Sequence, residues 1–155
     1  MTEQIDYAKV FNNVLQQKSN EQNVKEQMKG LVETHLVELE EILNDVVDNE
    51  ELEDVSVVLD DDVRELTFEY KSKTLEIKFD VEQMKLSIAD KIVSFNIDES
   101  SINNNSVKLD YNDEVDVFVS RVDNDIVYDL GADERNKAGL FTYIIERVAE
   151  LVAEA

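Results

Sequence analysis

The chain has 155 residues, of which 43% are apolar, and it contains no cysteine, no proline and three glycines. This length suits one domain with a real core, and we expect a single α+β domain over residues 1–155. The 37 acids and 15 bases give a net charge of −22, which opposes direct binding to nucleic acid and to anionic membranes. The composition also excludes disulfides, and the single histidine excludes zinc sites built from two or three histidines.

Two helices are predicted at the N-terminus. Apolar residues recur at helical spacing over residues 4–16, and a polar run at 16–20 interrupts the pattern. A second helix is expected from about 20 to 48, and Gly30 inside it should bend or divide it. This second helix carries an apolar stripe with heptad-like spacing, made of Val32, Leu36, Leu39, Leu43 and Val46.

A period of two replaces the helical period between residues 54 and 130. Up to eight short segments alternate apolar and polar residues there, including one at 115–119, and polar clusters separate them. The spacing predicts an antiparallel β-meander of about 6–8 short strands, with one face buried and the other in water. The segment 98–106 is expected to be the longest polar loop and a mobile one. A last helix, over about 133–153, has a broad apolar face that should pack on the sheet.

The negative charge is concentrated in two parts of the chain. Residues 33–65 carry fourteen acids and one base, and residues 110–134 carry nine acids and one base. Residues 1–32, by contrast, carry four acids and four bases. Like charges at helical spacing cost stability, and interleaved lysines would avoid that cost. The distribution therefore favours an acidic surface that binds a partner, although a run of acids is also an ordinary solvated face.

Four acids of the second predicted helix fall on the side opposite the apolar stripe: Glu38, Glu41, Asp45 and Asp48. We expect these residues to make the principal contact with a partner. A second contact is expected from acids in two predicted turns, which are Asp60, Asp61 and Asp62 in the first and Asp110, Asp113, Glu114 and Asp116 in the second. Aspartate is also an ordinary turn residue, so a purely structural role stays open for both turns.

No arrangement of residues indicates catalysis. The three glycines cannot form a phosphate-binding loop, and no serine lies in a nucleophile-elbow motif. The single histidine, His35, is expected at the boundary between helix and sheet. The aspartate clusters lack the EF-hand pattern of a calcium site. We therefore expect no enzyme activity, no catalytic residue, no metal and no cofactor.

These observations lead to the hypothesis of a non-enzymatic acidic binding protein that engages a basic surface of a partner protein. In its most concrete form it is an inhibitor, of the phage or mobile-element type, that mimics nucleic-acid charge and occludes a nucleic-acid-binding protein. The N-terminal sequence lacks the basic and apolar segments of a signal peptide, and no apolar run reaches 18 residues. We therefore expect a cytoplasmic location and no membrane contact.

Two alternatives stay open. The apolar stripe could pair with a second copy of the chain, which would make the protein a homodimer and suit a small acidic chaperone for assembly or secretion. The acidity could also serve only to keep the protein soluble.

Overall fold

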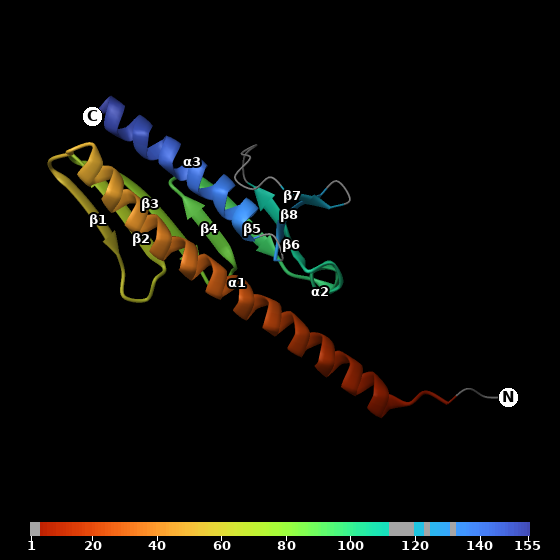
Figure 1. Cartoon of the computed structure of the whole chain (residues 1–155). Helices are drawn as coiled ribbons and strands as arrows, with labels where there is room; N and C mark the ends of the chain where they lie inside the picture. The colour runs from red at the N-terminus through yellow and green to blue at the C-terminus, as the bar shows by residue number, and fades with distance from the viewer. Residues whose placement is uncertain (1–3, 112–119, 123–124, 131–132) are drawn as a thin grey trace.

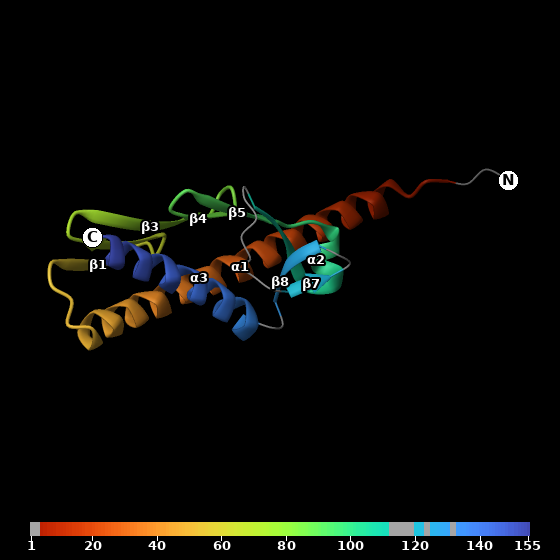
Figure 2. The same cartoon turned by 90° about the horizontal axis from the view of Figure 1, so that it is seen from above.

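The computed structural model describes residues 4–111, 120–122, 125–130 and 133–155. They form two layers, in which helices α1 (Tyr7–Asn49) and α3 (Asp133–Glu154) cover the same face of one antiparallel sheet (Figure 1, Figure 2). The predicted α+β class, the antiparallel sheet and the C-terminal helix packed on it are confirmed.

The described residues contribute eight strands to the sheet. In chain order these are β1 (Val55–Leu59), β2 (Glu65–Tyr70), β3 (Lys73–Asp80), β4 (Lys85–Ile88), β5 (Lys91–Asn96), β6 (Ser106–Tyr111), β7 (Ser120–Val122) and β8 (Asp125–Asp129). Their order across the sheet is β1-β2-β3-β4-β5-β6-β8-β7. The predicted meander is confirmed from β1 to β6, after which β8 pairs with β6 and β7 lies at the edge. The strand predicted at 115–119 lies outside the described residues.

Helix α1 is continuous, so the prediction of two separate helices, at 4–16 and 20–48, is wrong. Its N-cap is Asp6, whose carboxylate accepts a hydrogen bond from the backbone amide of Lys9 over 3.1 Å. Within the polar run at 16–20, glutamine and lysine are good helix formers. The side-chain amide of Gln16 also donates to Asn20, one turn later, over 3.1 Å. The helix therefore continues there on propensity and side-chain hydrogen bonds, without any apolar contact.

The apolar stripe of α1 forms one side of the core. Val32, Leu36 and Leu39 are at most 2% exposed, and Met28 extends the buried face by one turn towards the N-terminus. Alternate residues of the strands form the other side, and α3 adds three more buried residues, Leu140, Ile144 and Val148. The contact between this helix face and the sheet therefore fixes the orientation of α1. It thereby determines which residues of α1 face the solvent.

The first part of α1 extends beyond the sheet (Figure 1). Each of residues 4–19 is exposed, and we call this segment the N-terminal arm. Partial burial within α1 begins at Asn20 and becomes complete at Met28. The arm is thus a helical segment held by its own backbone hydrogen bonds and by its continuity with the anchored part of α1.

The segment 98–106 contains the short helix α2 (Glu99–Asn104), so the prediction of a long mobile loop is wrong. A capping box begins the helix: Asp98 accepts from the Ser101 amide over 3.2 Å, and the Ser101 hydroxyl accepts from the Asp98 amide over 3.0 Å. Asn105 ends it in the left-handed conformation with a φ of 51°. The short polar residues that suggested a loop are the residues that cap this helical turn.

The packing of α1 predicts that alanine substitutions at two nearby residues, Leu39 and Val37, have very different effects on the free energy of unfolding. Leu39→Ala should lower the free energy of unfolding by about 2–5 kcal/mol, because it leaves a cavity in the core. Val37 is 40% exposed on the same helix, and Val37→Ala should change that free energy by less than about 0.5 kcal/mol. Urea denaturation of both variants measures the difference, and similar losses would contradict the orientation of α1.

Gly30 occupies an exposed position within α1, and a Cβ atom added to it would meet nothing within 4 Å. Gly30→Ala should therefore raise the free energy of unfolding by about 0.5–1 kcal/mol, since glycine is a poor helix former. The same urea measurement checks this prediction. A loss of stability would show that α1 needs a bend at this position.

Candidate partner-binding site

Acidic residues follow the outer side of the C-terminal half of α1. Glu41, Asp45 and Asp48 are exposed, and they lie on the side of the helix opposite its buried stripe. We call these three residues the acidic face. They extend over roughly 10 Å of the helix axis. No basic residue occurs in this part of the sequence, between Lys29 and Arg64.

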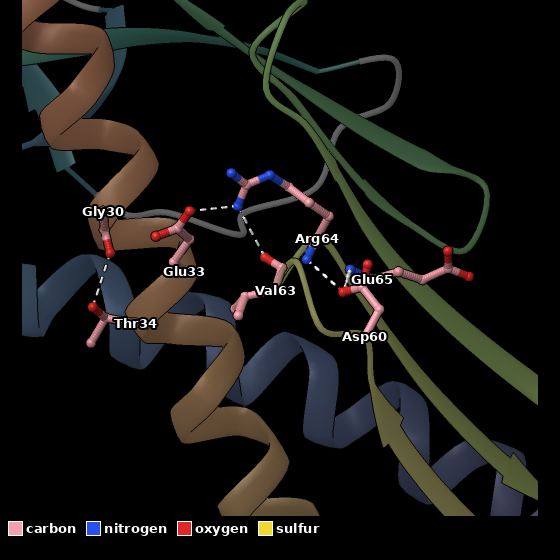
Figure 3. Close-up of polar contacts among 7 residues, drawn as sticks. All are labelled: Gly30, Glu33, Thr34, Asp60, Val63, Arg64 and Glu65. Atoms are coloured by element: carbon pink, nitrogen blue, oxygen red, sulfur yellow. Dashed lines mark hydrogen bonds and ion pairs between the residues drawn. The ribbon is translucent and has the colours of Figure 1, made fainter.

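Acids beside the acidic face are neutralised by bases from elsewhere in the fold. Glu38, which was predicted as part of the same contact, forms an ion pair with Lys137 of α3 at 3.0 Å. Glu33 binds Arg64 at 2.6 Å on the opposite flank (Figure 3). The ion pairs that join described residues include none with the three acids of the acidic face. The acidic face therefore keeps its full negative charge towards solvent.

The first predicted turn, with Asp60, Asp61 and Asp62, joins β1 to β2 and lies beside α1 (Figure 3). One carboxylate oxygen of Asp60 accepts hydrogen bonds from the backbone amides of Arg64, at 2.7 Å, and Glu65, at 2.9 Å. The bond from Glu65, reinforced by Arg64, holds the pKa of Asp60 below its usual value of 3.8. Asp60 thus has a structural role, whereas Asp61 and Asp62 are exposed and free to face a partner.

The second predicted turn does not join the acidic face through Asp110. This residue is exposed on β6, whereas the preceding Leu109 is buried in the core beneath the helices. Because side chains alternate along a strand, Asp110 points away from the helix layer, where it accepts a hydrogen bond from the Asn96 side chain. The remaining predicted residues of this turn lie outside the described part of the chain: Asp113, Glu114 and Asp116.

The uncovered face of the sheet carries a more balanced charge than the helix layer. Lys78 lies 3.2 Å from Glu76 on the same strand and 3.9 Å from Glu65 on the neighbouring strand. The hydrogen bond and the charge of Glu76, together with the charge of Glu65, raise the pKa of Lys78 above its usual 10.5. Bases and acids thus lie side by side around Lys78, whereas the ion pairs of the described residues leave out the acidic face of α1.

An apolar groove of about 340 Å³ lies between the C-terminal ends of α1 and α3. Val46 of α1 and Glu50, the C-cap residue that follows α1, line one side, and Ala149 and Val152 of α3 line the other. The small side chain of Ala149 leaves space between the two helices. None of the three acids of the acidic face lines the groove. Asp45 directly precedes Val46 in α1, so their side chains lie about 100° apart around the helix. Sequence reasoning missed the groove, because it arises only where two distant helices approach each other.

A buried polar pair connects α1 to the sheet and was also missed from the sequence. The ring nitrogen Nε2 of His35 lies 2.6 Å from the hydroxyl oxygen of Tyr128 on β8. Both residues are at most 1% exposed, and the edge of the Phe141 ring packs against the His35 ring with centroids 5.8 Å apart. His35 therefore lies within the core rather than at its boundary, and its hydrogen bond helps to fix α1 over β8.

The rest of the described structure contains no candidate metal site and no helix that could span a membrane. In residues 4–111, 120–122, 125–130 and 133–155, no three histidine, aspartate or glutamate side chains are placed to hold a metal ion. None of the described helices is both long enough and apolar enough to cross a membrane. Comparison of the chain with protein-family models, curated proteins and solved structures gives no significant match. The functional argument therefore depends on the geometry of the surface.

The hydrogen bonds of Asp60 predict a pH-dependent contribution to stability. Asp60→Ala should lower the free energy of unfolding by about 1–2 kcal/mol at pH 7, because two backbone amides lose their acceptor. The pKa of Asp60 is lowered on folding, so its contribution is complete well above pH 3.8 and is lost as the pH falls through the lowered value. The difference between wild type and Asp60→Ala in urea denaturation should therefore shrink below that pH. A constant difference at every pH would contradict the role of the ionised carboxylate.

Proposed function

We propose that the protein is a non-enzymatic binding protein that engages a basic segment of a partner protein through the acidic face of α1. The observation that carries this proposal is the charge of that face. Its three acids are exposed. Among the described residues, the acids on its two flanks, Glu33 and Glu38, form ion pairs, and no ion pair includes the three acids themselves. The absence of cysteine in the chain suits a reducing compartment, and we propose that the protein acts in the cytoplasm.

The acidic face supports electrostatic recognition. Its three charges follow each other at about 6 and 4.5 Å along the helix axis, somewhat wider than the roughly 3.4 Å rise per phosphate along one strand of DNA. A field of this kind accelerates the encounter with a basic surface and disfavours acidic partners. Mimicry of nucleic-acid charge is the more specific form of the proposal, and in it the partner is a protein whose basic surface otherwise binds nucleic acid.

The groove between the C-terminal ends of α1 and α3 supplies what charge alone lacks, which is a place for an apolar anchor. Exposed ion pairs contribute little net affinity, whereas a buried apolar side chain in a pocket often dominates an interface. Val46, Ala149 and Val152 could receive one or two aliphatic side chains. The partner segment that fits both features is an amphipathic helix with aliphatic residues on one face and lysine or arginine beside them.

The chaperone hypothesis loses the feature that suggested it. The apolar stripe of α1 is buried against the sheet of its own chain, where Val32, Leu36 and Leu39 are at most 2% exposed. The stripe from Val32 to Leu43 is therefore not available to a client or to a second copy in the folded protein, and only its last residue, Val46, lines the groove.

The remaining alternative is that the acidity serves only to keep the protein soluble. It predicts that no basic peptide prefers the acidic face over other acidic surfaces of the molecule.

A designed peptide tests the proposal directly. The probe is an amphipathic helix of lysine and leucine, about 18 residues long so that it can become helical. Calorimetry at low salt measures its binding to the wild type and to the variant Glu41→Gln/Asp45→Asn/Asp48→Asn. The variant should bind the peptide about tenfold or more weakly, and the affinity that remains should depend less on salt concentration. The matched control, Glu69→Gln/Glu76→Gln/Glu82→Gln, removes three exposed charges from the sheet layer and should bind as the wild type does.

Two further comparisons separate docking from plain attraction of charge. Ala149→Trp fills the groove without changing any charge, and it should weaken binding at low and high salt alike. A peptide in which serine replaces every leucine should bind the wild type much less tightly. The proposal is wrong if the serine peptide binds equally well, or if both triple variants lose the same affinity, because the acidity would then act only as a diffuse, solubilising field.

A further inference from the structure

The N-terminal arm exposes a row of large apolar side chains. Within residues 4–19, Tyr7 is 74% exposed, Phe11 is 64% exposed, and Val10, Val14 and Leu15 are each 50–52% exposed. Their spacing of three and four residues places them on one side of the helix. Together they expose on the order of 500 Å², which lies at the upper end for the largest apolar patch on a monomeric protein and indicates an interface.

The local sequence of the arm mixes good and weak helix formers. Asn12, Asn13 and Ser19 are weak helix formers, and Val10 and Val14 are β-branched. An isolated helix of this length is marginal in water even with favourable residues, and the arm is exposed along its whole length, so its continuity with the anchored part of α1 is what supports it. Pairing of the apolar side with another surface would stabilise the arm as the helix that the structure contains.

The charge of the arm indicates what that surface is. Residues 4–19 contain one acid, Asp6, and two bases, Lys9 and Lys18, whereas the chain has a net charge of −22. The arm is therefore a place where two copies of this protein can approach without strong repulsion. An antiparallel arrangement favours this further, because the acidic bodies then lie at opposite ends of the pair, beyond the screening length at physiological salt.

We propose that the N-terminal arm is a self-association site, in which two copies pair their arms as an antiparallel two-helix coiled coil. Tyr7, Phe11, Val14 and Lys18 follow steps of four, three and four. If the two-fold axis lies between Asn12 and Asn13, Phe11 meets Val14 of the second copy and Tyr7 meets its Lys18. The first contact is apolar, and the second places an ammonium group beside an aromatic ring.

The area of the contact suits a specific dimer. Two arms that cover their exposed apolar side chains would together bury about 1,000 Å², which is about the least area expected of a biological interface. The contact is isologous, so it closes after two copies and does not form a fibre. The inference is independent of the proposed function, although a dimer would present two acidic faces and so increase avidity for a partner with two basic segments.

Sedimentation equilibrium of the full chain, between about 1 µM and 1 mM, tests the proposal with two charge-matched variants. Val10→Lys/Val14→Lys places two charges on the apolar side of the arm, and Asn12→Lys/Gln16→Lys places two charges at the same spacing on its polar side. All four positions are exposed, so both variants should keep the fold. The wild type and the polar-side variant should dimerise alike, and the apolar-side variant should dimerise about 100-fold more weakly.

Disulfide cross-linking tests the antiparallel arrangement, and the chain contains no cysteine of its own. An oxidised mixture of Tyr7→Cys and Lys18→Cys chains should yield a mixed disulfide dimer. Tyr7→Cys alone should not, because the two positions lie about 16 Å apart along an antiparallel pair, beyond the reach of a disulfide. A monomeric wild type at every concentration, equal dimerisation of the two charge variants, or efficient cross-linking of Tyr7→Cys to itself would overturn the proposal.

Discussion

The contact between the apolar stripe of α1 and the sheet determines the placement of every surface feature of this protein. From Met28 to Leu43 one side of the helix is buried, and this burial contributes a large share of the hydrophobic free energy of folding. A helix anchored along one side must present its opposite side to water. The hydrogen bond between His35 and Tyr128 adds a directional constraint inside the same contact, which apolar packing alone does not supply.

Two different surfaces follow from that one contact along a single helix. Where α1 crosses the sheet, its outer side is acidic, and α3 beside it leaves the apolar groove. Where α1 extends beyond the sheet, the apolar side has no partner within the described chain and the charge is close to zero. The helix thus carries an exposed acidic surface along one part of its length and an exposed apolar surface along another. Ion pairs at Glu33 and Glu38 confine the acidic face to the middle of the outer side.

Much of the fold could be predicted from local pattern, because burial repeats every two residues in strands and about every 3.6 in helices. The sheet, the final helix and the apolar stripe follow from this rule. The continuity of α1 through residues 16–20 could not be predicted, since the apolar pattern stops there while the backbone remains helical. Nor could the pairing of Glu38 with Lys137, because no local pattern relates residues so distant in sequence. The acids of the acidic face were predicted as part of a helical stripe, together with Glu38, but the groove between α1 and α3 required the tertiary structure.

Backbone amide hydrogen exchange tests most directly whether α1 is buried in the core over one part of its length and pairs with a second copy over another. The exchange along α1 is measured at two protein concentrations. Exchange from Met28 to Leu43 should be slow at both concentrations and approach the rate set by global unfolding, because these residues form the core. The N-terminal arm should exchange rapidly when the protein is dilute and more slowly when it is concentrated, as pairing protects it. Equal protection of the arm at both concentrations, or rapid exchange along the whole of α1, would contradict this account.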